Sequence, residues 1–224
     1  EDILIKKDEN ALINNWANIL FENNRTIDKL NDCPLTNTEM QQVLTKVDLC
    51  KNSVDTNNFI NGKSVLIVRD NPDDKLHFGK EVSLKIYDRN EIAGGTSRYQ
   101  IAEQPIFKTS EDVNDRRGDV LLLINGMPVI HVELKRSGVS VNEAANQIKK
   151  YCHEGIFDRG IFSLVQIFVA MNPDETIYFA NLGRNGVLNK DFFFHWADYV
   201  NEPINDWKKI ASTFLSIPMA HQLV

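Results

Sequence analysis

The stretch that decides the fold is DVLLLINGMPVIHVELK, residues 119–135. Two apolar runs flank the dipeptide Asn125-Gly126, and Asn-Gly between such runs is a strong signal for a β-hairpin. The predicted strands are residues 119–124 and 128–135. An acidic residue, Asp119, opens the first strand, and Glu133 and Lys135 close the second.

Charged side chains in such apolar strands need a physical reason, because burying a charge is costly unless it is paired or bound to a metal ion. Glu133 and Lys135 are two residues apart, so they share one face of their strand. Together with Asp119 they would offer two carboxylates, a hard-oxygen set suited to Mg²⁺, and one cation. The alternative is an ion-pair ladder at the end of a strand, with no metal.

The type of turn decides whether Asp119 lies on the same face as Glu133. A two-residue loop without a bulge would turn Glu133 to the opposite face. A three-residue loop over residues 124–126, with Gly126 in the left-handed conformation and a bulge, makes Glu133 the diagonal neighbour of Asp119 on one face. We predict the three-residue loop or an equivalent bulge.

A helix is predicted directly after this hairpin, over residues 140–152, SVNEAANQIKKYC. Gln147 and Tyr151 are four residues apart and therefore lie on one face of this helix. They interleave with Ala144 and Ile148, the expected sheet-packing positions. Gln147 and Tyr151 would then point toward the carboxylates and hydrogen-bond a phosphate or the lysine. The alternative is a semi-buried amide beside a tyrosine whose hydroxyl reaches solvent.

The rest of the chain predicts a mixed α/β fold. Residues 1–60 have helical periodicity, and Thr36 followed by Glu39 is a capping-box signature. The further expected strands are residues 64–69, 82–88, 98–107, 164–171 and 176–182, and a last helix is expected over residues 201–216. This order of elements predicts a central mixed β-sheet flanked by helices, with a helical N-terminal section.

We expect one domain over residues 1–224, built from three sections. Residues 1–60 form an acidic helical section, residues 61–182 the core, and residues 183–224 a C-terminal strand and helix. The first section holds ten acidic against six basic residues, so it carries most of the net charge of −6. A solvated acidic face is one interpretation of this asymmetry, and a docking surface for a partner is the other.

Composition and motifs exclude several classes of protein. A net charge of −6 argues against a surface that binds DNA or anionic lipid everywhere, although a local cationic site is compatible with it. The longest apolar run has five residues, whereas a membrane span needs about 20. The three cysteines have no CxxC spacing, which indicates a reducing, cytoplasmic compartment rather than disulfides or a zinc site.

In combination, Asp119, the triplet Glu133-Leu134-Lys135 and the pair Gln147-x-x-x-Tyr151 resemble the PD-(D/E)xK nuclease superfamily. More closely, they resemble the N-terminal nuclease domain of the R (motor) subunit of type I restriction enzymes. The likeness is strongest over residues 98–153. It implies a restriction-endonuclease-like fold in which Asp119 and Glu133 bind Mg²⁺ and Lys135 is the catalytic lysine. It also implies that Gln147 and Tyr151 support DNA binding or cleavage.

The resemblance further implies a context for the domain. In the family an ATP-driven motor follows it, so ATP would be used only through that missing part. The subunit docks on methyltransferase and specificity subunits. The implied activity is that of a type I site-specific deoxyribonuclease, whose nuclease domain cuts double-stranded DNA without its own sequence specificity. The alternatives are a non-catalytic docking module of the same subunit, or a stand-alone nuclease of the superfamily in repair or recombination.

The sequence departs from the family pattern at one position, where Gly118 rather than proline precedes the aspartate. Superfamily members often add an acidic residue from an early helix, and the candidates here are Glu22 and Glu39. His131 lies two residues before Glu133 on the same face. We interpret it as a packed strand histidine, with a supporting role at the site as the alternative.

Overall fold

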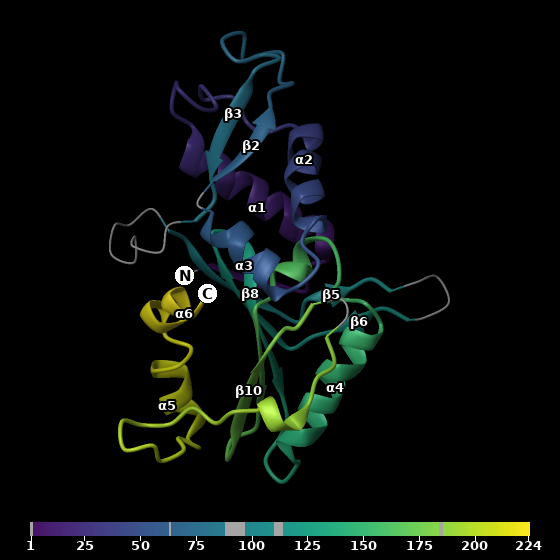
Figure 1. Cartoon of the computed structure of the whole chain (residues 1–224), viewed down its shortest axis with the longest axis vertical. Coiled ribbons are helices and arrows are strands. Elements are labelled where there is room, and N and C mark those ends of the chain that lie inside the picture. Colours follow the sequence, from purple (N-terminus) through teal and green to yellow (C-terminus); the bar gives the residue numbers. More distant parts are fainter. Residues whose placement is uncertain (1, 63, 88–96, 110–113, 184–185) are drawn as a thin grey trace.

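The computed structural model describes residues 2–62, 64–87, 97–109, 114–183 and 186–224. At its centre lies a β-sheet (Figure 1). The sheet has six strands in the order β1-β4-β7-β8-β9-β10. Its strands are β1 (Asp2–Ile5), β4 (Tyr99–Glu103), β7 (Val120–Ile124), β8 (Met127–Leu134), β9 (Ile167–Met171) and β10 (Thr176–Ala180). Strand β1 is parallel to β4 and β8 is parallel to β9, whereas the other neighbours are antiparallel. The predicted mixed sheet with flanking helices is confirmed.

The turn between β7 and β8 has two residues, so the predicted three-residue loop is wrong. Asn125 and Gly126 have φ angles of 51° and 83°, the left-handed pair that a tight hairpin turn requires. Asparagine tolerates this conformation better than other residues with a side chain, which is why the short turn is accessible. A Cβ on Gly126 would lie 2.7 Å from the Cα of Trp16, so helix α1 also excludes any larger residue here.

The equivalent bulge, which we predicted as the other possibility, is present. The register of the hairpin shifts by one residue after the second pair from the turn. At the far end of the hairpin, Val120 therefore pairs with Val132. Continued by one residue, this register sets Asp119 opposite Glu133, and directly opposite residues of two strands share a face. The bulge thus brings both carboxylates to one side of the sheet.

Helix α4 (Val141–His153) covers one face of the sheet, where it contacts β8 and β9. Ala144 and Ile148 are fully buried there, as their spacing predicted. The opposite face of β10 is covered by the C-terminal segment, because the ring of Tyr178 contacts the rings of Trp196 and Phe214. Two short 3₁₀ helices complete this part, η1 (Ile161–Leu164) and η2 (Lys190–Phe192).

The N-terminal section is helical as predicted. It consists of α1 (Glu9–Asn24), α2 (Asn37–Asp48) and α3 (Ser53–Asn61). The capping box of α2 is present, with the Thr36 and Glu39 side chains each accepting a backbone hydrogen bond from the other residue. Strand β1 was not predicted, because four residues before a helix carry little periodicity of their own.

A second, two-stranded sheet projects beside α1 and α2, at the top of Figure 1. It is formed by β2 (Ser64–Val68) and β3 (Glu81–Lys85). Side-chain amides from the helices complete its edges: Gln42 exchanges two hydrogen bonds with the backbone of Val68, and Asn24 does the same with Lys85. These amides tie the ribbon to α1 and α2 and satisfy edge groups that an isolated hairpin would expose.

Several predicted elements have different bounds in the structure, and two of them differ most. The helix predicted over residues 201–216 begins later than predicted, at Trp207, because Pro203 pairs with Ala197 in an isolated bridge. Helix α5 (Trp207–Ser212) begins after Asp206, whose carboxylate caps it, and α6 (Ile217–Leu223) follows separately. The predicted strand over residues 98–107 is divided, and its second part, β5 (Ile106–Phe107), pairs with β6 (Arg116–Arg117). Residue 88, the end of another predicted strand, lies outside the described residues.

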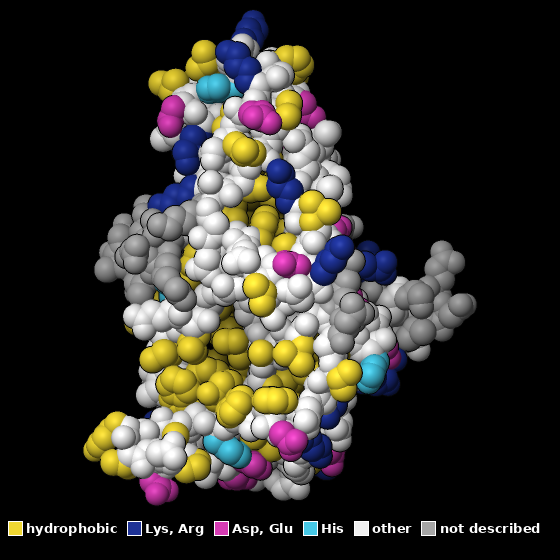
Figure 2. All heavy atoms as spheres, in the orientation of Figure 1, with side chains coloured by type: hydrophobic (Ala, Val, Ile, Leu, Met, Phe, Trp, Pro, Cys, Tyr) yellow, Lys and Arg dark blue, Asp and Glu magenta, His cyan; other side chains and the backbone are white. Residues whose placement is uncertain are grey.

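Hydrophobic and basic side chains are distributed differently over the surface seen in Figure 2. Hydrophobic side chains gather on its lower half, whereas lysine and arginine side chains are spread along the upper part and the right-hand margin (Figure 2). No helix among the described residues is both long and apolar enough to cross a membrane.

Candidate active site

Asp119 lies immediately before β7, where it is half-buried. Its backbone carbonyl accepts a hydrogen bond from the amide of Gln104 at 2.8 Å, which holds the residue against the neighbouring strand. Its carboxylate Oδ2 accepts one from the amide of Leu134 at 2.7 Å. This second bond crosses from the start of β7 to the end of β8 and places the Asp119 carboxylate beside Glu133 and Lys135.

Glu133 is the most constrained acidic group of the site, with a side chain only 1% exposed. Its Oε1 lies 3.5 Å from Nζ of Lys135, and its Oε2 lies 3.3 Å from Nε2 of His131. Within the described part of the chain, Oε2 has no hydrogen-bond partner. Burial raises the pKa of Glu133; the His131 and Lys135 side chains oppose that rise, and the neighbouring Asp119 carboxylate adds to it.

Lys135 is held by a chain of three hydrogen bonds that ends on the segment before Asp119. Its Nζ donates to Oε1 of Gln147 at 2.7 Å, and Nε2 of Gln147 donates to the hydroxyl of Tyr151 at 2.6 Å. The Tyr151 hydroxyl donates in turn to the backbone carbonyl of Arg117 at 3.0 Å. The structure therefore brings Gln147 and Tyr151 to the same site as Lys135, as their spacing predicted.

The hydroxyl of Tyr151 stays protonated at neutral pH, which this chain of bonds requires. Burial raises the pKa of Tyr151, the hydrogen bond from Gln147 opposes this, and the charges of Glu133 and Asp119 raise it again. A phenol has a single hydrogen to donate. Because that hydrogen goes to Arg117, the hydroxyl can only accept from Gln147, and the amide oxygen of Gln147 is left for Lys135.

His131 lies beneath the site in an aromatic surround, and both of its ring nitrogens are buried. Its ring makes edge or tilted contacts with Phe107, Tyr151 and Phe157, at centroid distances of 5.8, 6.2 and 5.4 Å. A Cβ on Gly118 would lie 2.8 Å from Cε1 of His131 and 2.8 Å from Phe107. The glycine before Asp119, the one departure from the family pattern, is therefore explained by these two rings.

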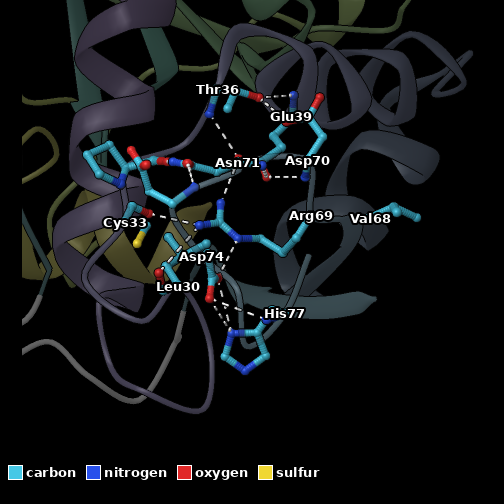
Figure 3. Close-up of polar contacts among 12 residues, drawn as sticks. Leu30, Cys33, Thr36, Glu39, Val68, Arg69, Asp70, Asn71, Asp74 and His77 are labelled. Carbon is cyan, nitrogen blue, oxygen red and sulfur yellow. Dashed lines mark hydrogen bonds and ion pairs between the residues drawn. The ribbon is translucent and has the colours of Figure 1, made fainter. Parts of the chain in front are cut away.

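The early-helix candidates do not join the site. Glu39 is part of a buried cluster around Arg69 (Figure 3), where its Oε2 lies 2.6 Å from Nη1 of that arginine. Its Oε2 also accepts from the amide of Thr36, and its Oε1 accepts from the amide of Asp70. Glu22 is exposed and pairs with an arginine one turn later. Neither Glu22 nor Glu39 therefore supplies an acidic group to the site, because each pairs with an arginine elsewhere.

The residues present fit a divalent cation of the hard-oxygen type. The Asp119 and Glu133 carboxylates lie near enough for the Asp119 charge to act on Glu133. One buried oxygen, Oε2 of Glu133, lacks a hydrogen-bond partner among the described residues. In a strand, the carbonyl and amide of one residue point to the same side, so the carbonyl of Leu134 also faces Asp119. No group of three or more histidine, cysteine, aspartate or glutamate side chains with metal-binding spacing occurs in the described ranges.

Sequence reasoning missed the groups that hold the site from the backbone, namely the Leu134 amide and the Arg117 carbonyl. It also missed the ion pair of Arg116 with Glu154, in which Nη2 and Oε1 are 2.7 Å apart. Such partners depend on three-dimensional register, which spacing along the chain does not give. Exposed cations suited to phosphate contacts are close in sequence to the site residues: Arg117, Arg136 and Lys150.

Fold and site together define a class of protein. It is a mixed α/β domain in which an aspartate before one central strand, β7, meets a Glu-x-Lys triplet at the end of the next, β8. A search of family models makes the class specific. Residues 4–186 match the family described as Type I restriction enzyme R protein N terminus (HSDR_N), and the chain belongs to this family.

Curated relatives agree with this family. The chain is 34% identical over 213 residues to the Type I restriction enzyme SauMSSORF170P endonuclease subunit of Staphylococcus aureus (strain MSSA476), an alignment covering 93% of the chain and 20% of the relative. The SsaAORF53P endonuclease subunit of Staphylococcus saprophyticus gives the same identity and coverage. The EcoprrI endonuclease subunit of Escherichia coli is 39% identical over 99 residues, 44% of the chain and 32% of the relative. The chain thus spans about a fifth of the length of the first two relatives.

Proposed function

We propose that this chain is the Mg²⁺-dependent DNA endonuclease domain of a type I restriction enzyme R subunit. The observation that carries the proposal is the placement of Asp119 opposite Glu133, with Lys135 held beside them by Gln147. The membership of the family and the endonuclease relatives support it. The reaction would be hydrolysis of a phosphodiester in double-stranded DNA, with no sequence preference of the domain itself.

In this proposal the acidic residues of the site and its lysine have different roles. Asp119 and Glu133, with the carbonyl of Leu134, would hold the cation. When bound, Mg²⁺ would polarise the phosphodiester and lower the pKa of the attacking water. Lys135 would orient that water and balance the negative charge that develops on the phosphate oxygens.

Gln147 and Tyr151 would act through Lys135. Their hydrogen bonds fix the lysine ammonium at one place, 3.5 Å from Glu133, so its charge is pre-positioned before DNA arrives. In the reaction the water loses a proton and its oxygen forms a new bond to phosphorus, one ester bond breaks, and the leaving oxygen takes up a proton. Pre-positioned charge matters most for such steps because it costs no reorganisation at the moment of reaction.

Beyond the reaction, the proposal extends to the whole subunit. In it, residues 1–224 form one domain, ATP acts only through a motor outside these residues, and the methyltransferase and specificity subunits are the protein partners in the cytoplasm. The described residues contain no disulfide between the three cysteines, which is compatible with that reducing compartment.

The experiment is a cleavage assay with the R subunit assembled on its methyltransferase and specificity partners, comparing the parent with Asp119→Asn and Lys135→Ala. We expect both variants to lose DNA cleavage by a factor of at least about 100 while ATP hydrolysis and assembly persist. Cleavage by Asp119→Asn at the parental rate would contradict the proposal. In that case a docking module would be the better account, with residues 1–60 as the first surface to examine.

A further inference from the structure

We propose that His131 is a positioning residue for the Glu133 carboxylate, and that its Nε2 carries the proton that faces Glu133. The inference rests on the proposed function, since it assigns a role toward the same cation. It concerns a residue that the family pattern of Asp119, Glu133, Lys135, Gln147 and Tyr151 does not include.

The first observation is the contact itself. Nε2 of His131 lies 3.3 Å from Oε2 of Glu133, and both side chains are at most 1% exposed. Neither atom completes a hydrogen bond in the described structure. A small rotation of the carboxylate would close the contact, and hydrogen bonds in metal-free or substrate-free sites are often long and tighten when the site is occupied.

The second observation is that the ring cannot turn away. Phe107, Tyr151, Phe157 and Phe168 contact it on several sides, with centroid distances between 5.4 and 6.3 Å. At Gly118 even a Cβ would lie 2.8 Å from Cε1 of the ring. The surround therefore fixes the histidine in the orientation in which one nitrogen faces Glu133.

The third observation concerns chemistry rather than shape. A phenylalanine would fill this aromatic surround without leaving a polar atom buried, whereas an unpaired buried nitrogen costs about 1–3 kcal/mol. A buried histidine avoids this cost only if a ring nitrogen interacts with a polar group. The Glu133 carboxylate, 3.3 Å from Nε2, is such a group. With Oε2 directed to His131, Oε1 is the oxygen directed to Lys135, 3.5 Å away, and each carboxylate oxygen keeps a second lone pair for the cation.

A hydrogen bond of this kind sets the orientation and basicity of a metal-binding carboxylate. Partners that hydrogen-bond metal ligands typically contribute 10–100-fold to metal affinity. His131 would thus act on the cation through Glu133, without touching the cation or the DNA.

The test is calorimetric titration of Mn²⁺ into the metal-free chain and its His131→Phe and His131→Gln variants. Phenylalanine keeps the aromatic packing and removes the N–H, whereas glutamine offers an amide N–H at a similar reach. We expect about 10–100-fold weaker binding for His131→Phe and a loss of only a few-fold for His131→Gln. Thermal unfolding of each variant identifies any that does not fold.

Equal Mn²⁺ affinity of the parent and His131→Phe would overturn the inference. The proposed function would still stand in that case if Asp119→Asn abolished binding. Should the parent bind no Mn²⁺, the proposed function is the part that fails, and a second measurement then decides the inference. In the nitrogen-15 spectrum of the parent, we expect the ring proton of His131 on Nε2, and a proton on Nδ1 alone would contradict the assigned role.

Discussion

At the scale of single residues, the hydroxyl hydrogen of Tyr151 determines the orientation of the Gln147 side-chain amide. The hydroxyl of Tyr151 donates to the carbonyl of Arg117, so it accepts from Gln147 and turns the amide oxygen of Gln147 toward Lys135. Spacing predicted that Gln147 and Tyr151 share a helix face and reach a phosphate or the lysine. It did not predict that Gln147 alone contacts Lys135 while Tyr151 donates to Arg117. The contacts depend on the packing of α4 against β8, which no local pattern encodes.

The first prediction concerns the removal of the Tyr151 hydroxyl. Tyr151→Phe frees the Gln147 amide to turn its NH₂ group toward Lys135, which would repel the ammonium group. We expect DNA cleavage by the assembled enzyme to fall about tenfold, since one lost hydrogen bond of this kind contributes roughly 1–1.5 kcal/mol. Tyr178→Phe, a half-buried tyrosine on β10, is the matched control and should cleave normally. Equal rates for both variants would contradict the role given to Tyr151.

The burial of Glu133 makes a prediction about pH and stability. Burial raises the pKa of Glu133 in the folded chain above its ordinary value of 4.5, so the unfolded chain releases this proton first. The stabilising contribution is complete below the ordinary pKa and is lost as the pH rises through the raised folded value. We therefore expect metal-free Glu133→Gln to be more stable than the parent at about pH 7.5, and the difference to vanish near pH 4.

Urea unfolding at the two pH values measures this difference, and Glu154→Gln provides a control of opposite sign. The hydrogen bonds from Arg116 lower the pKa of Glu154, so its stabilising contribution is present above the ordinary pKa and lost in acid. Glu154→Gln should accordingly be less stable than the parent at neutral pH. A Glu133→Gln variant that is also less stable there would mean that Lys135 and His131 outweigh the cost of burial.

At the scale of elements, the central hairpin was largely predictable and its register was not. The apolar runs and Asn125-Gly126 identified both strands, and the helix over residues 140–152 was confirmed almost to the residue. The expected three-residue loop was wrong, whereas the equivalent bulge, our other expectation, is present. It sets Asp119 opposite Glu133 rather than diagonal to it, and its position was not predicted. A bulge in a strand buried on both sides leaves no trace in the alternation of polar and apolar residues.

The ribbon of β2 and β3 depends on one buried arginine, which gives a third prediction. Arg69 pairs with Glu39 and with Asp74, at 2.6 and 3.0 Å, and all three side chains are 0% exposed (Figure 3). Arg69→Ala leaves two buried acidic groups without their cation, so we expect a loss of about 3–5 kcal/mol in the free energy of unfolding. Arg25→Ala, which removes an exposed pair with Asp32, is the control and should change stability little.

Denaturant unfolding of both variants, monitored by circular dichroism, measures these losses. Equal stability of Arg69→Ala and Arg25→Ala would contradict the structural role of the buried cluster. Mn²⁺ binding should be unchanged in Arg25→Ala, because Arg25 pairs with Glu22 and Asp32 rather than with the site.

At the scale of the whole molecule, composition indicated a globular chain but not the arrangement of its parts. The acidic section over residues 1–60 was recognised as helical, yet nothing in it indicated that β1 joins the central sheet beside β4. The C-terminal helix was placed too early, because Pro203 suits either a first helical turn or an isolated bridge. Long-range pairing of this kind is set by packing and not by local propensity.

The overall charge leads to a fourth prediction, on DNA binding. The net charge is −6, so the overall electrostatic attraction to DNA is weak. We expect the isolated chain to bind unrelated duplexes equally, with a Kd in the micromolar range or weaker at about 150 mM salt. Fluorescence anisotropy with two duplexes of unrelated sequence measures this. A strong preference for one of them would contradict cleavage without intrinsic sequence specificity.

The central claim is that Asp119 and Glu133 hold one divalent cation between the ends of β7 and β8. Calorimetric titration of Mn²⁺, as a substitute for Mg²⁺, into the metal-free chain and its Asp119→Asn and Glu133→Gln variants tests it most directly. We predict saturable binding of one ion by the parent and loss of that binding in each variant, with folding retained. Binding that survives both substitutions would contradict the claim and move the metal site elsewhere in the molecule.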